Sequence, residues 1–416
     1  MHESPGGAAA LLRSNPGLGL LLAARGVSFL GDGIALVALL VYVQQASGTA
    51  TAVAALLLVA DLVPALVAPL AGAAADQYRP RTTLIVCEVT QALLAVLLAL
   101  LLARLPNLGL MLGVVALVAA FAAAAKPAAR LALVDAVPIR DLAPANALFG
   151  AATHGLEAAA PLVAAAMLTV WGVSGILMAD AATFVAAALM LTRLPNPARS
   201  PAAQADRPEA VSLSAGVRFV WSTPAVRAVA LGFFALVACT GVDDVGLVVL
   251  ARDNLSAAAP AAAALYAASG IGLATGYLAL TRFGHSYPPL RMLVGGFAVA
   301  SIGNLLTGVA PGLGLVFACQ AVRGVGVAVL DVALNTFVQR DTPAYLHGRL
   351  LSALYGLAGL GAALAYLVGG PLVDAVGAPQ AFGYAGTAGL LTTAFTAFAL
   401  HRAGGLRPPP AAPPAP

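Results

Sequence analysis

The sequence predicts an all-α integral membrane protein with about twelve transmembrane helices, arranged as two pseudo-symmetric six-helix halves. Apolar residues make up 61% of the 416 residues and charged residues only 9%, whereas soluble domains carry roughly 25% charged residues. Long apolar stretches recur along the chain, and basic residues fall almost entirely into alternate loops. A soluble fold could not bury so much apolar surface, so the bilayer is expected to solvate it.

An apolar stretch that approaches the length needed to cross the hydrocarbon core, about 20 residues, predicts a span. In the first half we expect spans at 17–44, 51–74, 82–104, 108–126, 144–170 and 174–193. In the second half we expect spans at 224–251, 258–282, 288–310, 312–339, 345–372 and 378–402. The loops between them are short, and many contain proline, glycine or asparagine.

The longest internal gap between spans divides the chain into its two halves. The expected regions are a cytoplasmic tail at 1–16, the first half at 17–193, a cytoplasmic linker at 194–223, the second half at 224–402 and a disordered Pro/Ala tail at 403–416. Within the linker, the pattern at 211–221 predicts a short amphipathic helix on the membrane surface.

The basic residues predict the orientation, because lysine and arginine are retained on the cytoplasmic side. With the N-terminus inside, seventeen of the 21 basic residues fall in inside segments, Lys126 and Arg130 among them. The outside loops hold only Arg104 and Arg252. This bias predicts an even number of spans with both termini in the cytoplasm. The first sixteen residues lack a signal-peptide pattern, so the first apolar segment is expected to be retained.

Weak internal repeats relate the two halves. Three matches recur at offsets of 204, 205 and 206 residues: Gly72 with Gly276, Val137-Pro138 with Thr342-Pro343, and Leu148-Phe149-Gly150 with Leu354-Tyr355-Gly356. Repeated halves around a midplane site are typical of transporters.

The second predicted loop carries a recognisable signature. It reads Gly72-Ala-Ala-Ala-Asp76-Gln-Tyr-Arg79-Pro-Arg81, which resembles the loop signature of the major facilitator superfamily. A glycine lets two helices approach closely, and an aspartate at a helix end can pair with a neighbouring helix N-terminus or a basic residue. The resemblance implies that these four numbered residues gate the cytoplasmic side in the outward-facing state.

Three further segments resemble the branch of that superfamily that holds siderophore exporters and macrolide-efflux-type permeases. They run from Arg25 through Asp32 to Gly33, from Asp135 through Asn146 to Leu148, and from Thr342 through Gly348 and Arg349 to Leu350. The resemblance implies the major facilitator fold, secondary transport by alternating access, and residence in a bacterial inner membrane.

Charged residues within the predicted spans are the candidate site residues. A charge at the bilayer centre costs at least about 2.5–3.5 kcal/mol on insertion scales, so it should face a cavity or a partner. The candidates for proton coupling or the substrate cavity are Asp32, Asp61, Glu157, Asp243, Asp244, Asp331 and Arg323. The alternative for each is a structural pair, such as Asp32 with Arg25 or Asp331 with Arg323. Glu88 and Asp180 are expected to pack structurally.

The favoured function is proton-coupled efflux of small amphipathic compounds by an antiporter, because the expected cavity is mostly apolar with a few carboxylates. An importer or a lipid flippase on the same fold stays open, as does an integral membrane enzyme. The enzyme is disfavoured because the five histidines are scattered and no nucleophile elbow occurs.

No cofactor, metal or nucleic-acid partner is expected, and the protein is expected to act as a monomer. The cysteines Cys87, Cys239 and Cys319 lie singly in apolar runs, without metal or redox spacing. No glycine-rich loop precedes the Lys-Ser/Thr of a phosphate site. Because Lys126 is the only lysine, the arginine content is read as a coding bias rather than a sign of nucleic-acid binding.

Overall fold

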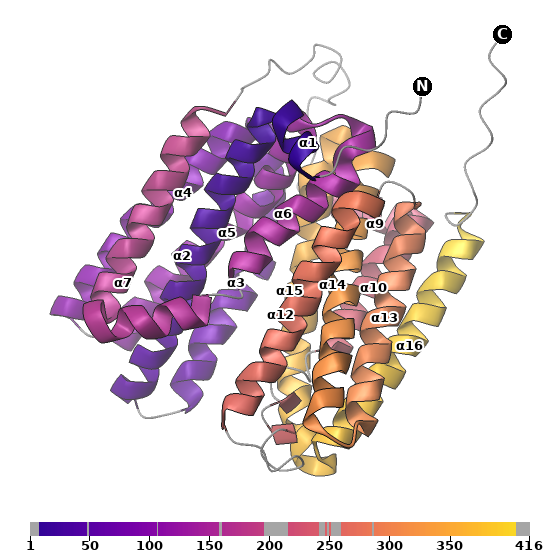
Figure 1. Cartoon of the computed structure of the whole chain (residues 1–416). Coiled ribbons are helices and arrows are strands. Elements are labelled where there is room, and N and C mark those ends of the chain that lie inside the picture. Colours follow the sequence, from indigo (N-terminus) through magenta and orange to yellow (C-terminus); the bar gives the residue numbers. More distant parts are fainter. Residues whose placement is uncertain are drawn as a thin grey trace, which may run out of the picture.

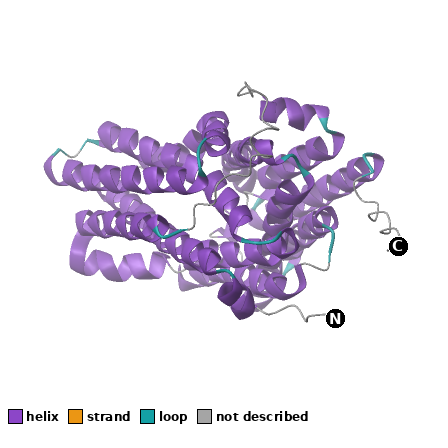
Figure 2. Ribbon diagram, turned by 90° about the horizontal axis from the view of Figure 1, so that it is seen from above, coloured by secondary structure: helices purple, strands orange, loops and turns teal. Residues whose placement is uncertain are grey.

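The chain folds into two helical bundles that lie side by side (Figure 1). The computed structural model describes residues 8–47, 50–105, 107–157, 160–194, 215–240, 246–247, 249–250, 259–284 and 287–404. Within these residues the regular structure is helical and no strand occurs (Figure 2).

The first bundle is formed by the N-terminal helices. They are α1 (Ala8–Ser14), α2 (Pro16–Ser47), α3 (Ala50–Gln77), α4 (Pro80–Arg104), α5 (Leu108–Ala136), α6 (Leu142–Glu157) and α7 (Ala160–Thr192), with the 3-10 turn η1 (Ile139–Asp141). Helix α7 packs on α2 and α4, and α5 packs on α3 and α4. These contacts close the first half around its own apolar core.

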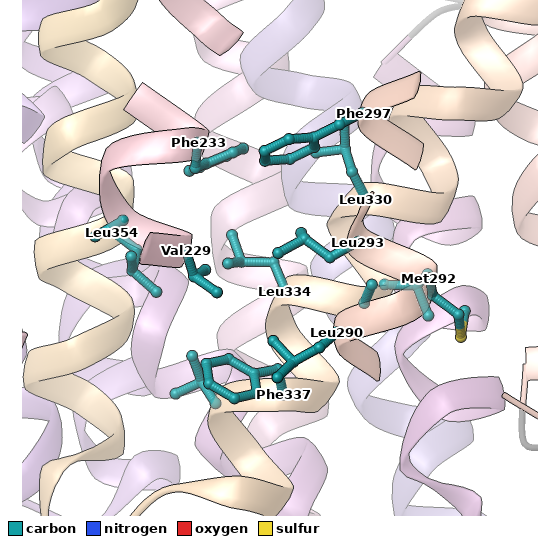
Figure 3. Packing of buried hydrophobic residues seen from close by; sticks show 14 of the residues in the cluster. Val229, Phe233, Leu290, Met292, Leu293, Phe297, Leu330, Leu334, Phe337 and Leu354 are labelled. Carbon is teal, nitrogen blue, oxygen red and sulfur yellow. The ribbon is translucent and has the colours of Figure 1, made fainter. Parts of the chain in front are cut away.

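The second bundle is formed by the C-terminal helices. They are α9 (Ala215–Ser222), α10 (Pro224–Thr240), α12 (Ala259–Phe283), α13 (Pro289–Val309), α14 (Leu313–Asp341), α15 (His347–Val376) and α16 (Ala378–Arg402), with the 3-10 turn η4 (Ala344–Leu346). Figure 3 shows its core, where Phe233 of α10, Phe297 of α13 and Leu334 of α14 pack together.

Membrane-length helices dominate the described residues. Eight are long and apolar enough to cross a membrane, and the number rises to nine if the bent pair α9 and α10 forms one span. The bend between those two helices is 105°, so α9 runs across the direction of the spans. Helix α9 overlaps the predicted amphipathic segment, whose first residues, 211–214, lie outside the described residues.

One predicted span has different bounds in the structure. The span predicted at 108–126 ends too early, because α5 continues to Ala136. Proline at position 127 does not end it, since transmembrane helices tolerate proline and the alanine-rich sequence favours helix. Lys126 and Arg130 therefore lie within a helix, and their assignment to a loop was wrong.

The span predicted at 144–170 covers α6, which is described to Glu157, and the first part of α7, which is described from Ala160. Residues 158 and 159 lie outside the described residues. Within α7, Gly172 has φ +62°, and this kink lies between the spans predicted at 144–170 and 174–193.

The internal repeats appear as repeated structure. Pro138 after α5 and Pro343 after α14 each precede a 3-10 turn, η1 and η4, that leads into the next helix. Their φ angles, −61° and −62°, are nearly the same. The segment from α5 to α6 in the first half therefore corresponds to the segment from α14 to α15 in the second.

The halves meet along two helix pairs that the repeat relates. Helix α15 packs along α3 and also contacts α5, whereas α6 packs on α12 and α14. Glycine allows the first of these approaches: a Cβ on Gly356 would lie 2.9 Å from the Cβ of Ala68, and one on Gly359 would lie 3.2 Å from that of Ala65. These two seams position the polar groups between the halves.

Candidate functional site

Asp76, at the end of α3, contacts the start of α15 in the other half. Its Oδ1 accepts the backbone N–H of Gly348 at 2.7 Å, and its Oδ2 accepts the backbone N–H of Arg349 at 3.0 Å. The guanidinium of Arg349 also donates to Oδ2 at 2.9 Å, and both side chains are buried. The carboxylate thus satisfies N–H groups that the first turn of a helix leaves unpaired. We call Asp76, Gly348 and Arg349 the latch, and the end of the bundle where it lies the latch end.

Glycine makes the latch possible. A Cβ on Gly72 would lie 2.7 Å from Cα of Arg349, and a Cβ on Gly348 would lie 2.6 Å from Oδ1 of Asp76. Both distances are too short for real carbon contacts, so side chains at these positions would push α3 and α15 apart. The spacing of Gly72 and Asp76 puts the close approach and the carboxylate one turn apart on the same helix face.

The two arginines of the loop signature lie elsewhere. Arg79 is exposed and directly precedes α4. Arg81 donates to the backbone carbonyl of Thr192 at the end of α7, within the same half. The basic partner of Asp76 comes instead from Arg349 in the other half.

A second polar contact joins the halves around Arg130 of α5. Its Nη1 donates to Oδ1 of Asn146 on α6 at 2.9 Å, and its Nη2 donates to Oδ2 of Asp331 on α14 at 3.2 Å. The side chains of Arg130 and Asp331 are 5% and 17% exposed, so this ion pair is largely shielded from solvent. The Arg130 guanidinium also lies over the ring of Phe149, 4.5 Å from its centroid.

Amide groups extend this contact across the interface. Asn146 donates through Nδ2 to Oε1 of Gln339 at 2.6 Å and to Oγ1 of Thr336 at 3.2 Å. Gln339 in turn donates to the backbone carbonyl of Arg130 at 3.1 Å. The two halves therefore exchange hydrogen bonds in both directions.

Asp331 also accepts hydrogen bonds from residues of its own half. Tyr277 of α12 donates to Oδ2 at 3.2 Å, and Asn335 donates to Oδ1 at 3.0 Å. The hydroxyl of Tyr355 on α15 donates to Oδ1 of Asn335 at 2.7 Å. Tyr277 reaches this position because Gly150 of α6 leaves room for its ring. We call the following residues the inter-half network: Arg130, Asn146, Tyr277, Asp331, Asn335, Gln339 and Tyr355.

A cavity of about 280 Å³ lies between the halves, beside the network. It is bounded by α3 and α5 of the first half and by α10 and α15 of the second. Its polar lining residues are Asp61, Lys126, Ser352 and Tyr355, and the others are alanine, glycine, proline and valine. Tyr355 belongs to both structures, because it lines the cavity and donates to Asn335.

The first half contains a separate charged cluster. Arg25 of α2 and Glu88 of α4 form an ion pair, with side chains 3% and 0% exposed. Arg25 therefore pairs with Glu88 and not with Asp32. Asp32 lies near enough to Asp180 of α7 for the two carboxylates to interact electrostatically. Asp180 is itself buried and accepts from the hydroxyl of Thr183.

The remaining predicted residues either lie apart from these groups or have side chains that the structure does not describe. Arg323 donates to the hydroxyl of Ser269 on α12 at 3.0 Å, so it is not the partner of Asp331. Glu157 ends α6, and its side chain is not described. Asp243 and Asp244 lie outside the described residues. Of the predicted carboxylates, Asp61 thus lines the cavity and Asp331 lies in the inter-half network.

Sequence reasoning missed most of the polar partners. Arg130 and Lys126 were placed in a loop. Asn146 and Tyr355 were named only within a resembling segment and a repeat, and Tyr277 and Asn335 were not singled out. A signal was present, because each of these side chains interrupts an apolar helix. Arg349 was noted only as part of a resembling segment, since nothing in its own sequence identifies Asp76 as its partner.

Solved structures share this architecture. FucP in the outward conformation matches with a TM-score of 0.74 and 17% identity, over 92% of this chain and 98% of that chain. A bacterial homologue of the iron transporter ferroportin, in the outward-facing state, matches with a TM-score of 0.73 and 17% identity over 93% and 99%. The human organic anion transporter MFSD10 matches with a TM-score of 0.71 and 14% identity over 91% and 98%. At these identities the likeness shows the fold.

The fold and the seams between the halves define a polytopic helical membrane protein built from two halves. The model of the Major Facilitator Superfamily matches residues 21–285, and the chain belongs to that family. An uncharacterised MFS-type transporter of Mycobacterium tuberculosis is 30% identical over 96 residues, which is 23% of this chain and 17% of that protein. The predicted twelve-helix fold and the family resemblance are thereby confirmed, and the protein is a transporter rather than an enzyme.

Proposed function

We propose that the protein exports small amphipathic compounds in exchange for protons, by alternating access between its two halves. The observation that carries the proposal is the position of the cavity. It lies between the halves, lined by residues of both, and is directly connected through Tyr355 to the inter-half network. A site at the interface of two repeats, opened alternately by their rocking, is how such transporters work.

The orientation follows from the basic residues. If the termini lie in the cytoplasm, as the distribution of arginine favours, the latch end is cytoplasmic. The latch and the inter-half network then close the cytoplasmic side, and the described conformation faces outward. We accordingly assign Asp76, Gly72 and Arg349 a gating role, in a monomer of the bacterial inner membrane.

Asp331 is the carboxylate we assign to proton coupling. It is the acidic group that holds Arg130 of the opposite half. Protonation would remove the negative charge from that contact and weaken the closure of the latch end. A proton taken up from outside would therefore favour inward opening, which links proton entry to the conformational change. Asp32 is the alternative carboxylate, because a second acid, Asp180, lies near it.

The test is an accumulation assay in a bacterium that lacks its own efflux pumps. A panel of fluorescent amphipathic compounds, cationic, zwitterionic and anionic, is followed with and without a protonophore. The wild type, Asp331→Asn and Asp32→Asn are compared at equal membrane expression. Asp374→Asn is the matched control, because Asp374 is exposed near the end of α15.

The expected result is lower accumulation of at least one compound with the wild type and with Asp374→Asn. The protonophore and Asp331→Asn should both abolish the difference. Loss through Asp32→Asn alone would move the coupling site to the first half. Higher accumulation with the wild type would indicate import, and no effect on any compound would contradict export of amphipathic molecules.

A further inference from the structure

Two opposite charges line one cavity between the halves, Lys126 from α5 and Asp61 from α3. We propose that this cavity binds a small zwitterionic amphipathic molecule, with Lys126 holding its carboxylate and Asp61 holding its ammonium group. The inference rests on the proposed function, whose substrate class it names.

Lys126 is the strongest evidence for an anionic group on the ligand. It is the only lysine of the chain, and it lies inside a membrane-length helix with its side chain exposed to the cavity. It forms no ion pair with any other described residue, Asp61 included. A charge at this depth is costly, and such residues mark substrate or ion pathways.

Ser352 adds a second group suited to a carboxylate. It lines the cavity with Lys126, yet it is only 3% exposed, and its hydroxyl has no hydrogen-bond partner among the described residues. A buried hydroxyl without a partner carries a desolvation cost that a ligand acceptor would remove. An ammonium and a hydroxyl donor together fit the two oxygens of a carboxylate.

Asp61 supplies the complementary charge from a neighbouring helix of the same half. It belongs to α3, which α15 approaches closely at this point. A Cβ added to Gly359 of α15 would lie 3.2 Å from the backbone carbonyl oxygen of Asp61. Its carboxylate can accept hydrogen bonds from an ammonium group. A purely cationic ligand could use the same contact. Lys126 opposes such a cation, because like charges in a cavity of low polarity repel strongly. The two residues together therefore favour a molecule that carries both charges.

The rest of the lining limits the size and the remaining chemistry of the ligand. Small apolar residues surround the four polar ones, which suits an apolar body. The volume of about 280 Å³ lies near the lower limit for ligand sites, roughly 300–1,000 Å³. We therefore expect a compact ligand, with one apolar group and a carboxylate close to its ammonium group.

Binding of three matched probes tests this inference. Phenylalanine carries both charges, its methyl ester only the ammonium group, and its N-acetyl derivative only the carboxylate. Isothermal titration calorimetry of the full chain in lipid nanodiscs measures affinity without requiring transport. The zwitterion should bind about tenfold or more tightly than either derivative, since a hydrogen bond to a charged group is lost in each.

Variants assign the two charges. Lys126→Gln should abolish the preference for the zwitterion over the ester, and Asp61→Asn should abolish the preference over the acetyl derivative. Arg104→Gln and Asp374→Asn make the same charge changes at exposed positions outside the cavity, and both should retain the wild-type preferences. Lys126→Arg keeps the charge and should retain part of the preference.

The outcomes separate this inference from the proposed function. Equal affinity for the three probes in the wild type, or no binding of the zwitterion, would overturn the inference even if export is observed. An unchanged preference in Lys126→Gln would also overturn it. If the wild type and variants show the expected preferences but no compound is transported in cells, the ligand site stands and the export proposal fails.

Discussion

The carboxylate of Asp76 in the first half accepts the backbone N–H of Gly348, at the start of α15 in the second half, at 2.7 Å. A helix N-terminus carries a partial positive charge and unpaired N–H groups, so it stabilises a carboxylate placed there. The contact needs both helices in register, and α15 also lines the cavity. Closure of the latch end and the shape of the cavity therefore depend on the same helix.

Replacing Asp76 by asparagine should loosen the latch. The amide can accept one N–H but lacks the charge that holds Arg349, and a hydrogen bond to a charged group contributes about 1.5–3 kcal/mol. We expect a larger fraction of molecules with the latch end open. Spin labels at Tyr78 and Ala344, in a background without Cys87, Cys239 and Cys319, would report this as a longer distance component. An unchanged distance distribution would argue that the latch is not the gate.

A methyl group at position 72 should have a related effect through sterics alone. In Gly72→Ala the new Cβ would lie 2.7 Å from Cα of Arg349, which the backbone must relieve by moving. We expect a lower thermal midpoint in detergent and the same opening of the latch end. Gly113→Ala is the control, because a Cβ there meets nothing within 4 Å. Equal midpoints for the two variants would mean that α3 and α15 do not need their close approach.

The ion pair between Arg130 and Asp331 should show strong coupling. Removing one partner leaves the other charge largely buried, which typically costs about 3–5 kcal/mol for a fully buried pair. Arg130→Gln and Asp331→Asn should each lower the thermal midpoint. The double variant should lower it by less than the sum of the two single decreases. A thermal double-mutant cycle measures this coupling. Additive losses would indicate that the two charges act independently.

The fold could be predicted from the sequence because the bilayer imposes simple rules. Span length and the retention of basic residues are local properties, and they were sufficient for twelve spans in two halves. An error arose where local signals conflict. Lys126 followed by Pro127 looks like the end of a span, yet α5 continues to Ala136.

The site was less predictable, because its partners come from distant parts of the chain. Asp331 and Arg130 are 201 residues apart, and Asp76 and Gly348 are 272 apart. A lone sequence marks Asp331 as a costly charge without naming the group that compensates it, so Arg323 on the same helix was the obvious candidate. The tertiary structure brings Arg130 instead, because the two repeat-related seams place α5 and α14 at the same interface.

The buried pair of Arg25 and Glu88 gives a prediction about stability rather than gating. Both residues belong to the first half, and their side chains are 3% and 0% exposed, so the pair does not cross the moving interface. Arg25→Met would leave Glu88 as a buried unpaired acid, and we expect a loss of about 3–5 kcal/mol. Arg25→Met with Glu88→Gln should recover much of that loss, because the remaining groups are neutral.

Thermal unfolding in nanodiscs checks this, with Arg104→Met as the exposed control. The latch-end distances between Tyr78 and Ala344 should stay unchanged in the double variant, because its contacts lie within one half. A stable double variant with altered distances would instead assign this pair to the conformational change. Glu88 also lies near enough to Asp180 to interact with it electrostatically. That result would therefore make the carboxylates of the first half, beginning with Asp32, the candidates for driving the conformational change.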